Sequence, residues 1–160
     1  MAKIERKYLA HYINAAAPGG ESAVYERLGK DLEEFSPELA AQVETKKNIL
    51  GQTSVVISGY DKTGAVEPYY AEKDSLLFTR LQDILDEGRV LEDVKTDVLE
   101  VKLWEQNEDG TYPAIREEAY IEITSYGGDT TGYQLAFTLH FTGSKTKGTF
   151  NVTEKTFTAA

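Results

Sequence analysis

The chain has 160 residues, 41% of them hydrophobic and 28% charged, which is typical of one ordered globular domain covering 1–160. Its formal net charge of -10 argues against sequence-specific DNA or RNA binding, because an acidic surface repels phosphates. The absence of cysteine excludes disulfides, thiolate metal sites and a cysteine nucleophile. The charged N-terminus and the lack of a long apolar run predict neither a signal peptide nor a membrane span.

The N-terminal quarter of the sequence has no single interpretation. Residues 7–13 fit either a short strand or part of an N-terminal arm that covers 1–22. Residues 23–28 and 31–35 then fit two short strands. A helix over 21–35 is the alternative, because Glu, Leu and Lys are good helix formers.

The middle of the chain begins with a clear strand pattern. TSVVISGY, at 53–60, is rich in β-branched residues and predicts a strand. The polar segment 61–73 that follows carries Tyr69 and Tyr70. It has the length of a functional or interface loop rather than a simple turn.

One α-helix is predicted at about residues 75–87, in the segment DSLLFTRLQDILDEG. Asp74 or Ser75 can cap its first turn, and Gly88 occupies the position that follows a helix end. We expect Arg80 on the solvent side, together with Asp83 and Glu87. The apolar residues that recur at helical spacing are Leu77, Phe78, Leu81, Ile84 and Leu85.

After the helix, the hydrophobic period changes to two, which is the period of strands. The clearest example is 133–142, where Tyr, Leu, Phe, Leu and Phe alternate with polar or small residues. The fold class predicted from this pattern is mainly β: an antiparallel β-sandwich or barrel with one flanking α-helix. The other predicted strands are 97–104, 118–124, 147–152 and 155–158.

The glycine-rich stretch SYGGDTTG, at 125–132, is a candidate phosphate-binding loop or a hairpin turn. A phosphate cradle needs a helix N-terminus directed at the anion, but this loop lies between two predicted strands. We therefore predict a hairpin with Asp129 and Thr130 at its tip, where glycines adopt positive φ.

Catalytic patterns are not evident. The two histidines, His11 and His140, lack metal-site spacing, and adjacent acids such as Glu117 and Glu118 face opposite sides of a strand. We therefore expect no enzyme activity, no cofactor and no metal. A carbohydrate-binding module would need an exposed aromatic platform, for which the candidates are Tyr112, Tyr120, Tyr126 and Tyr133.

Two blocks of the sequence resemble the tail tube (major tail) proteins of tailed phages and prophages of Gram-positive bacteria. One block covers 44–88 and the other 123–158. The motifs that carry the resemblance are NILG (48–51), PYYAEKDSLLF (68–78), YGGDTTGYQ (126–134) and KGTFNVTEKTFT (147–158).

The resemblance implies a structural virion protein, assembled in the host bacterial cytoplasm. Such subunits form hexameric rings, and the rings stack into a hollow tube through which the genome passes during ejection. The implied partners are further copies of the chain, the tape-measure and tail-terminator proteins, and double-stranded DNA that passes without specific binding; no membrane is involved. The alternatives are the tube of a contractile tail or tailocin, and a monomeric β-sandwich binding module.

Within a tube, an acidic wall would let DNA pass, because added cationic contacts would attract phosphates. The candidate lumen-facing residues are on the polar faces of the long strands, although such faces can instead be buried between subunits or lie outside. These candidates are Glu100, Glu122, Gln134 and Thr138.

Ring closure and stacking need heterologous contacts, in which one patch meets a different patch on the neighbour. The loop 61–73 and the arm 1–22 are the candidate donors. Tyr69 and Tyr70 are candidate anchors, since tyrosine combines apolar area with a hydroxyl, although packing on the helix is the alternative for both. The full set of candidate interface residues is Tyr69, Tyr70, Glu67, Lys73, Tyr8 and Tyr12.

Overall fold

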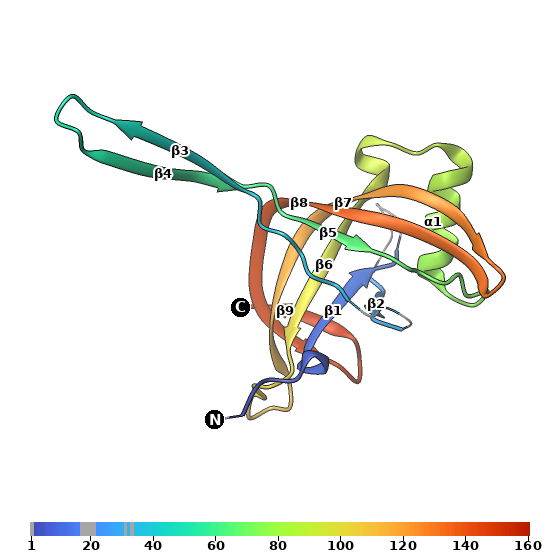
Figure 1. Cartoon of the computed structure of the whole chain (residues 1–160). Helices are drawn as coiled ribbons and strands as arrows, with labels where there is room; N and C mark the ends of the chain where they lie inside the picture. The colour runs from blue at the N-terminus through green and yellow to red at the C-terminus, as the bar shows by residue number, and fades with distance from the viewer. Residues whose placement is uncertain (1, 17–21, 31, 33) are drawn as a thin grey trace.

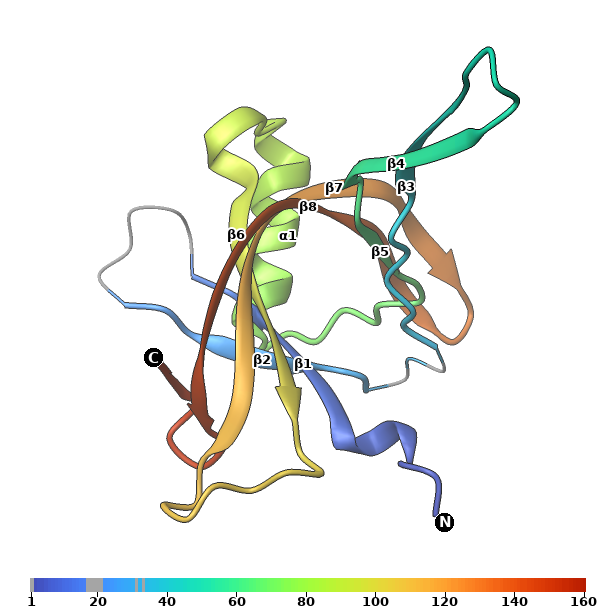
Figure 2. The same ribbon diagram turned by 90° about the vertical axis from the view of Figure 1, so that its left-hand side faces the viewer.

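The computed structural model describes residues 2–16, 22–30, 32 and 34–160. A curled antiparallel sheet has the strand order β2-β1-β6-β7-β8-β5, with β9 paired to β8. One helix, α1, packs on it, and the hairpin β3-β4 projects away as a separate two-stranded sheet (Figures 1 and 2). The elements are η1 Arg6–Tyr8, β1 Leu9–Asn14, β2 Tyr25–Leu28, β3 Ala41–Lys47, β4 Thr53–Tyr60, β5 Thr63–Val66, α1 Leu76–Glu87, η2 Leu91–Val94, β6 Lys95–Lys102, β7 Tyr112–Asp129, β8 Gly132–Asn151 and β9 Thr156–Ala159.

The spine of the sheet is the pairing of β7 with β8, which are 18 and 20 residues long. The predicted strands 118–124 and 133–142 are confirmed, but each is only the apolar middle of a longer strand. The predicted pair 147–152 and 155–158 is the end of β8 against β9. The hairpin turn after Asp129 is also confirmed, with Gly127, Gly128 and Gly132 at positive φ.

The N-terminal predictions have different outcomes. For residues 7–13 the strand alternative is confirmed, since β1 lies between β2 and β6 in the sheet and is not part of an arm. Residues 31–35 were expected to be a strand; 31 and 33 lie outside the described residues, and the other three are in no strand. The segment 61–73 is not one long loop, because it contains β5, which pairs with β8.

The sheet buries apolar side chains on both faces. The helix-side core lies on one face, where alternate residues of β8 pack against α1. The second core lies on the opposite face, near the end where β9 pairs with β8. The helix-side core includes Ile13, Val98, Ile121, Leu135, Phe137, Leu139, Leu77 and Leu81, and the second core includes Tyr12, Tyr25, Leu99, Val101, Ala114 and Phe150.

The predicted helix is confirmed. Ser75 is its N-cap and accepts a hydrogen bond from the Phe78 N–H, while Gly88 ends it in the left-handed conformation. Glu26 of β2 adds a second cap, because its carboxylate accepts from the backbone N–H groups of Leu76 and Leu77. No helix among the described residues has the length and apolar character to cross a membrane.

The prediction that Arg80 faces solvent is wrong, since its side chain is buried between α1 and the sheet. Its guanidinium donates hydrogen bonds to the carbonyl oxygens of Asn14, Ala16 and Lys95. Burial lowers the pKa of Arg80, yet three carbonyl acceptors satisfy most of its donors. The helical spacing of the sequence cannot show that Arg80 is buried, because its carbonyl acceptors lie outside the helix, in other parts of the chain.

Replacing Arg80 with Met should lower the free energy of unfolding by about 3 kcal/mol, because three buried carbonyls lose their donors. Chemical denaturation followed by circular dichroism measures this change. The control is Arg89→Met, two residues beyond the end of the same helix, whose ion pair with Asp83 is exposed, so this substitution should change stability far less. Equal effects of the two substitutions would contradict a structural role for the buried guanidinium.

Candidate assembly site

The β3-β4 hairpin is the feature of this molecule that a folded monomer does not account for. Among the described residues its strands pair only with each other, and Figures 1 and 2 both show it extending away from the sheet. At ~3.3 Å per residue, the seven-residue β3 extends roughly 20 Å. A two-stranded hairpin is marginally stable alone in water. We therefore take it as the candidate assembly site.

One face of this hairpin is apolar although it is exposed. Val43 pairs with Ile57, and Thr45 pairs with Val55, so all four side chains lie on one face. The three aliphatic members are each more than half exposed. The other face pairs Glu44 with Val56 and Lys46 with Ser54, and therefore carries two charges, whereas Lys47, paired with Thr53, lies at the tip end of the apolar face.

The hairpin tip is also apolar. The turn NILGQ is organised by Asn48, whose side-chain oxygen accepts from the N–H groups of Leu50 and Gln52. Gly51 closes it at a φ of 80°. This geometry leaves Ile49 and Leu50 at the tip, 103% and 77% exposed.

Sequence reasoning found β4 but missed β3 and therefore the hairpin. The segment AQVETKK contains one large apolar residue, so it shows no clear alternation. The available signal was the NILG turn directly before TSVVISGY, because a tight turn ahead of a strong strand implies a partner strand.

The root of the hairpin is fixed to the sheet by a buried ion pair. Lys62, two residues beyond β4, places its Nζ 2.5 Å from Glu117 Oε1. Both side chains are largely buried, and the ammonium lies 4.6 Å from the centre of the Phe141 ring. The Lys62 carbonyl also accepts from the Phe141 N–H. The direction of the hairpin is therefore coupled to the β7-β8 spine.

A neutral histidine lies near this root. His11 is buried on the helix-side face of β1, and its ring packs edge-on against Phe35 at 4.7 Å. Burial, with smaller contributions from the charges of Arg6 and Lys62, lowers the pKa of His11 to about 4. The imidazole is therefore uncharged at neutral pH, which avoids a second buried cation beside Lys62.

The four predicted lumen-facing residues do not share one face. Glu122 pairs with Thr138 on β7 and β8, and Gln134 lies on the same face of β8. Glu100 pairs with Ile115 on β7. Ile115 lies on the same face of β7 as the buried Ile121, because alternate residues of a strand share a face. Glu100 therefore lies on the helix side, whereas the other three lie on the opposite, outer face; as lumen-facing residues, all four stay predictions.

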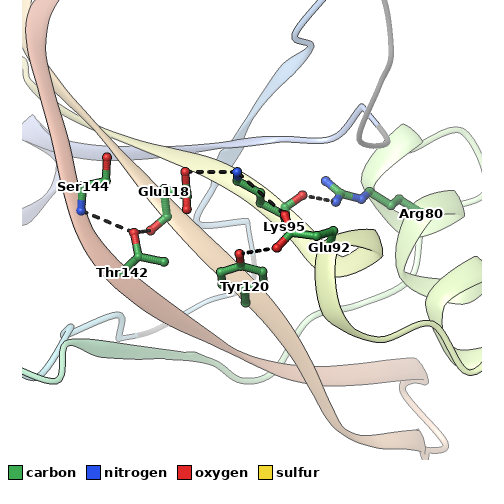
Figure 3. A network of polar contacts seen from close by, with 7 residues as sticks. All are labelled: Arg80, Glu92, Lys95, Glu118, Tyr120, Thr142 and Ser144. Carbon is green, nitrogen blue, oxygen red and sulfur yellow. Dashed lines mark hydrogen bonds and ion pairs between the residues drawn. The ribbon is translucent and has the colours of Figure 1, made fainter.

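The outer face of β6, β7 and β8 carries a polar network, drawn in Figure 3. The Lys95 ammonium is 3.3 Å from Glu118, and the Tyr120 hydroxyl donates to Glu92 at 3.1 Å. The Glu118 carboxylate raises the pKa of Lys95, and the Glu92 carboxylate raises that of Tyr120. Further along the face, Glu122 pairs with His140 at 2.6 Å.

The predicted interface residues have different environments. Tyr12 is 5% exposed inside the second core, so it cannot be a surface anchor, and that prediction is corrected. Tyr69 packs on the helix-side core and its hydroxyl contacts Ser75. Tyr70 contacts Thr131 at the β7-β8 turn. Glu67 and Lys73 are exposed and Tyr8 is 39% exposed; with Tyr69 and Tyr70, they stay predictions as interface residues.

The four tyrosines considered for a ligand platform do not gather. Tyr112 pairs with Phe150 and Tyr120 with His140, so they lie eight residues apart along β7, about 26 Å at the strand rise. Tyr133 instead packs edge-on with Phe78 of the helix. Among the described residues, no group of three or more His, Asp or Glu side chains is placed to hold a metal ion.

Comparisons with known proteins give a match in structure but none in sequence. No protein-family profile and no curated protein matches the chain. The solved structure of the SPP1 tail tube, determined by solid-state NMR and cryo-EM, matches 91% of this chain and 78% of that chain with a TM-score of 0.63 at 16% identity. The chain has the fold of a phage tail tube subunit.

A second solved structure is similar at a lower level. The baseplate of the anti-feeding prophage, symmetrised six-fold, matches 92% of this chain and 97% of that chain, with a TM-score of 0.48 at 8% identity. The predicted class, mainly antiparallel β with one flanking α-helix, is confirmed by the fold of the SPP1 match, and the predicted sandwich or barrel takes the form of a curled sheet.

Replacing Glu117 with Gln should lower the free energy of unfolding by about 3 kcal/mol, because it leaves the Lys62 cation buried without a counter-charge. The double variant Lys62→Met/Glu117→Leu removes both charges and should recover most of that loss. Urea denaturation of the three proteins measures both effects. A double variant as unstable as the single one would show that packing, not charge pairing, determines the stability here.

Stability should also depend on His11 below neutral pH. The folded-state pKa of about 4 lies below the ordinary value of 6.5, so the unfolded chain binds the proton first. The His11 contribution is complete above pH ~6.5 and decreases by up to about 3 kcal/mol as the pH falls to ~4. Unfolding measured from pH 7 to 4 should show this loss in wild type and not in His11→Phe, whereas the exposed-site control His140→Asn should keep it.

Proposed function

We propose that this protein is the subunit of a phage tail tube: copies form rings, the rings stack, and the hollow tube conducts the viral genome during ejection. The observation that carries the proposal is the β3-β4 hairpin, an apolar and free-standing projection on a tail tube fold.

The hairpin needs a protein partner. Burying a half-exposed Val or Ile side chain contributes roughly 1–2 kcal/mol, so Val43, Val55 and Ile57 together favour association. The Lys62–Glu117 pair fixes the chain just beyond β4 to the sheet, and in this arrangement these apolar side chains stay uncovered. Contact between a hairpin on one copy and a different surface on the next is heterologous, which is the contact type that builds rings and open stacks.

The outer face of the sheet suits a wall along which DNA passes. Acidic groups outnumber basic ones there, since Glu92, Glu118 and Glu122 stand beside Lys95 and His140. The Lys95 charge is already paired with carboxylates, so it is less available to phosphates. We therefore place Glu122, Thr138 and Gln134 on the channel side as part of this proposal.

The proposal includes a location and partners. Assembly takes place in the bacterial cytoplasm, the product is the tail of the virion, and the rings are hexameric. The tape-measure and tail-terminator proteins are the expected partners at assembly. The tube of a contractile tail or tailocin is the alternative within the same class. No specific feature of the described residues favours a monomeric binding module.

The test is negative-stain electron microscopy of the concentrated protein, with light scattering alongside. We expect rings or tubes with a central hole of roughly 20 Å or more, wide enough for duplex DNA. Val55→Lys, on the apolar face of the hairpin, should abolish them while the circular dichroism spectrum stays unchanged.

The matched control is Val56→Lys, the next residue on the same strand, whose side chain lies on the charged face opposite Glu44. It adds the same charge and should leave assembly intact. Equal loss of assembly in both variants would contradict a role for the apolar face. A wild-type protein that stays monomeric at every concentration would count against the tube.

A further inference from the structure

A cavity of about 470 Å³ opens between η1, β1, β2 and the segment that follows β2. Its volume lies within the range of small-molecule sites, roughly 300–1,000 Å³. The lining residues form a buried floor, half-buried walls and an exposed rim. The floor is His11, Leu28 and Phe35, the walls are Leu9 and Leu32, and the rim is Arg6, Lys7, Arg27, Gly29 and Lys30.

The rim of this cavity is cationic, and its two arginines are held by neutral groups. Arg6 donates hydrogen bonds to the carbonyl oxygens of Leu9 and Phe35, and Arg27 donates one to the Lys7 carbonyl. A carbonyl oxygen fixes a guanidinium in place without cancelling its charge. Each guanidinium has five N–H donors, so both keep donors for a further acceptor.

The carboxylates near the rim do not neutralise the two arginines. Glu5 pairs with Lys7, and Glu72 pairs with Lys30, both at exposed positions where ion pairs contribute little. On β6, Glu100 and Lys102 lie on the same face, so that strand adds one charge of each sign. After β2, Glu34 bonds to Ser36, while Asp31 and Glu33 lie outside the described residues. None of the described carboxylates forms an ion pair with Arg6 or Arg27.

The floor and walls of the cavity are suited to an apolar group. The His11 ring packs edge-on against Phe35, with a distance of 4.7 Å between the ring centres. Burial lowers the pKa of His11 to about 4, so at neutral pH the floor carries an uncharged imidazole. The three leucines of the lining complete an apolar surface below a cationic rim.

We infer that this cavity binds a small amphiphilic anion: one apolar chain or ring that ends in a carboxylate. The apolar part lies against the His11 and Phe35 rings, and the carboxylate meets the guanidinium groups of Arg6 and Arg27. The planar fork of a guanidinium matches the two oxygens of a carboxylate. The described lining includes no residue of the β3-β4 hairpin, so the inference goes beyond the proposed function and does not depend on it.

The chain has two histidines, which makes NMR of the histidine ring signals a direct test. His11 lies in the cavity floor, whereas the His140 side chain is 49% exposed on the outer face and serves as the internal control. Octanoate, kept below its micelle concentration, is titrated into the whole protein at pH 7. Acetate, an anion without the chain, and 1-octanol, a chain without the charge, are titrated in the same way.

We expect octanoate to shift the His11 signals saturably and to leave those of His140 unchanged. It should bind at least about tenfold more tightly than acetate, because the chain buries several CH₂ groups. It should also bind more tightly than 1-octanol, because only the carboxylate meets the cationic rim.

A set of variants tests the cationic rim. Arg6→Met should weaken octanoate binding about fivefold and leave 1-octanol binding unchanged, since one partly exposed charge pair is lost. Arg6→Lys keeps the charge and should retain most of the octanoate affinity. The matched control is Lys3→Met, which removes an exposed cation of the same segment that does not line the cavity. Circular dichroism confirms that each variant is folded.

Three results would overturn the inference. The first is the absence of a saturable His11 shift, or an equal shift at His140. The second is 1-octanol binding as tightly as octanoate, which would leave an apolar cavity without an anion site. The third is acetate binding as tightly as octanoate, which would leave no role for the apolar floor. The wild-type ligand series decides these points even if Arg6→Met fails to fold, and none of them bears on tube assembly.

Discussion

The long antiparallel pairing of β7 with β8 is the interaction on which the remaining structure depends. These strands run side by side from Tyr112 and Phe150 to the turn at Asp129 and Gly132, with two irregularities in register. The main sheet is built outward from this ribbon: β6 and β5 pair on its two sides, β1 and β2 follow β6, β9 pairs with its end, and the helix packs on its apolar face. Because the ribbon curls, one continuous sheet covers two separate cores.

The first irregularity in the ribbon, between Glu117 and Ala119, is also where the hairpin is rooted. Buried ion pairs contribute little net stability compared with apolar packing, but a single arrangement satisfies them. The Lys62–Glu117 pair is therefore better understood as a device that sets the direction of a projecting element. The neutral state of His11 fits this interpretation, since it leaves Lys62 as the cation that Glu117 pairs with.

Buried polar groups of the molecule find hydrogen-bond partners within the chain, whereas a set of apolar side chains stays exposed. Arg80 finds its acceptors within the subunit, and so does the helix N-terminus through Glu26. The hairpin keeps apolar side chains exposed along one face and at its tip, where Ile49 and Leu50 are among the most exposed apolar residues of the described chain. Under the proposed function, this exposed apolar surface is what assembly would bury.

Local patterns determined much of this protein. The strand at 53–60, the helix with its caps, the turn after Asp129 and the alternation along 133–142 all follow from residue spacing within one element. The tertiary structure alone decided which strands pair and which face of each strand is buried. It placed Glu100 and Glu122 on opposite faces, buried Arg80 and Tyr12, made the N-terminal segment a central strand, and left β3 and β4 without a third strand. The physical reason is range: periodicity is set by neighbours in sequence, whereas register and burial depend on contacts between residues far apart in it.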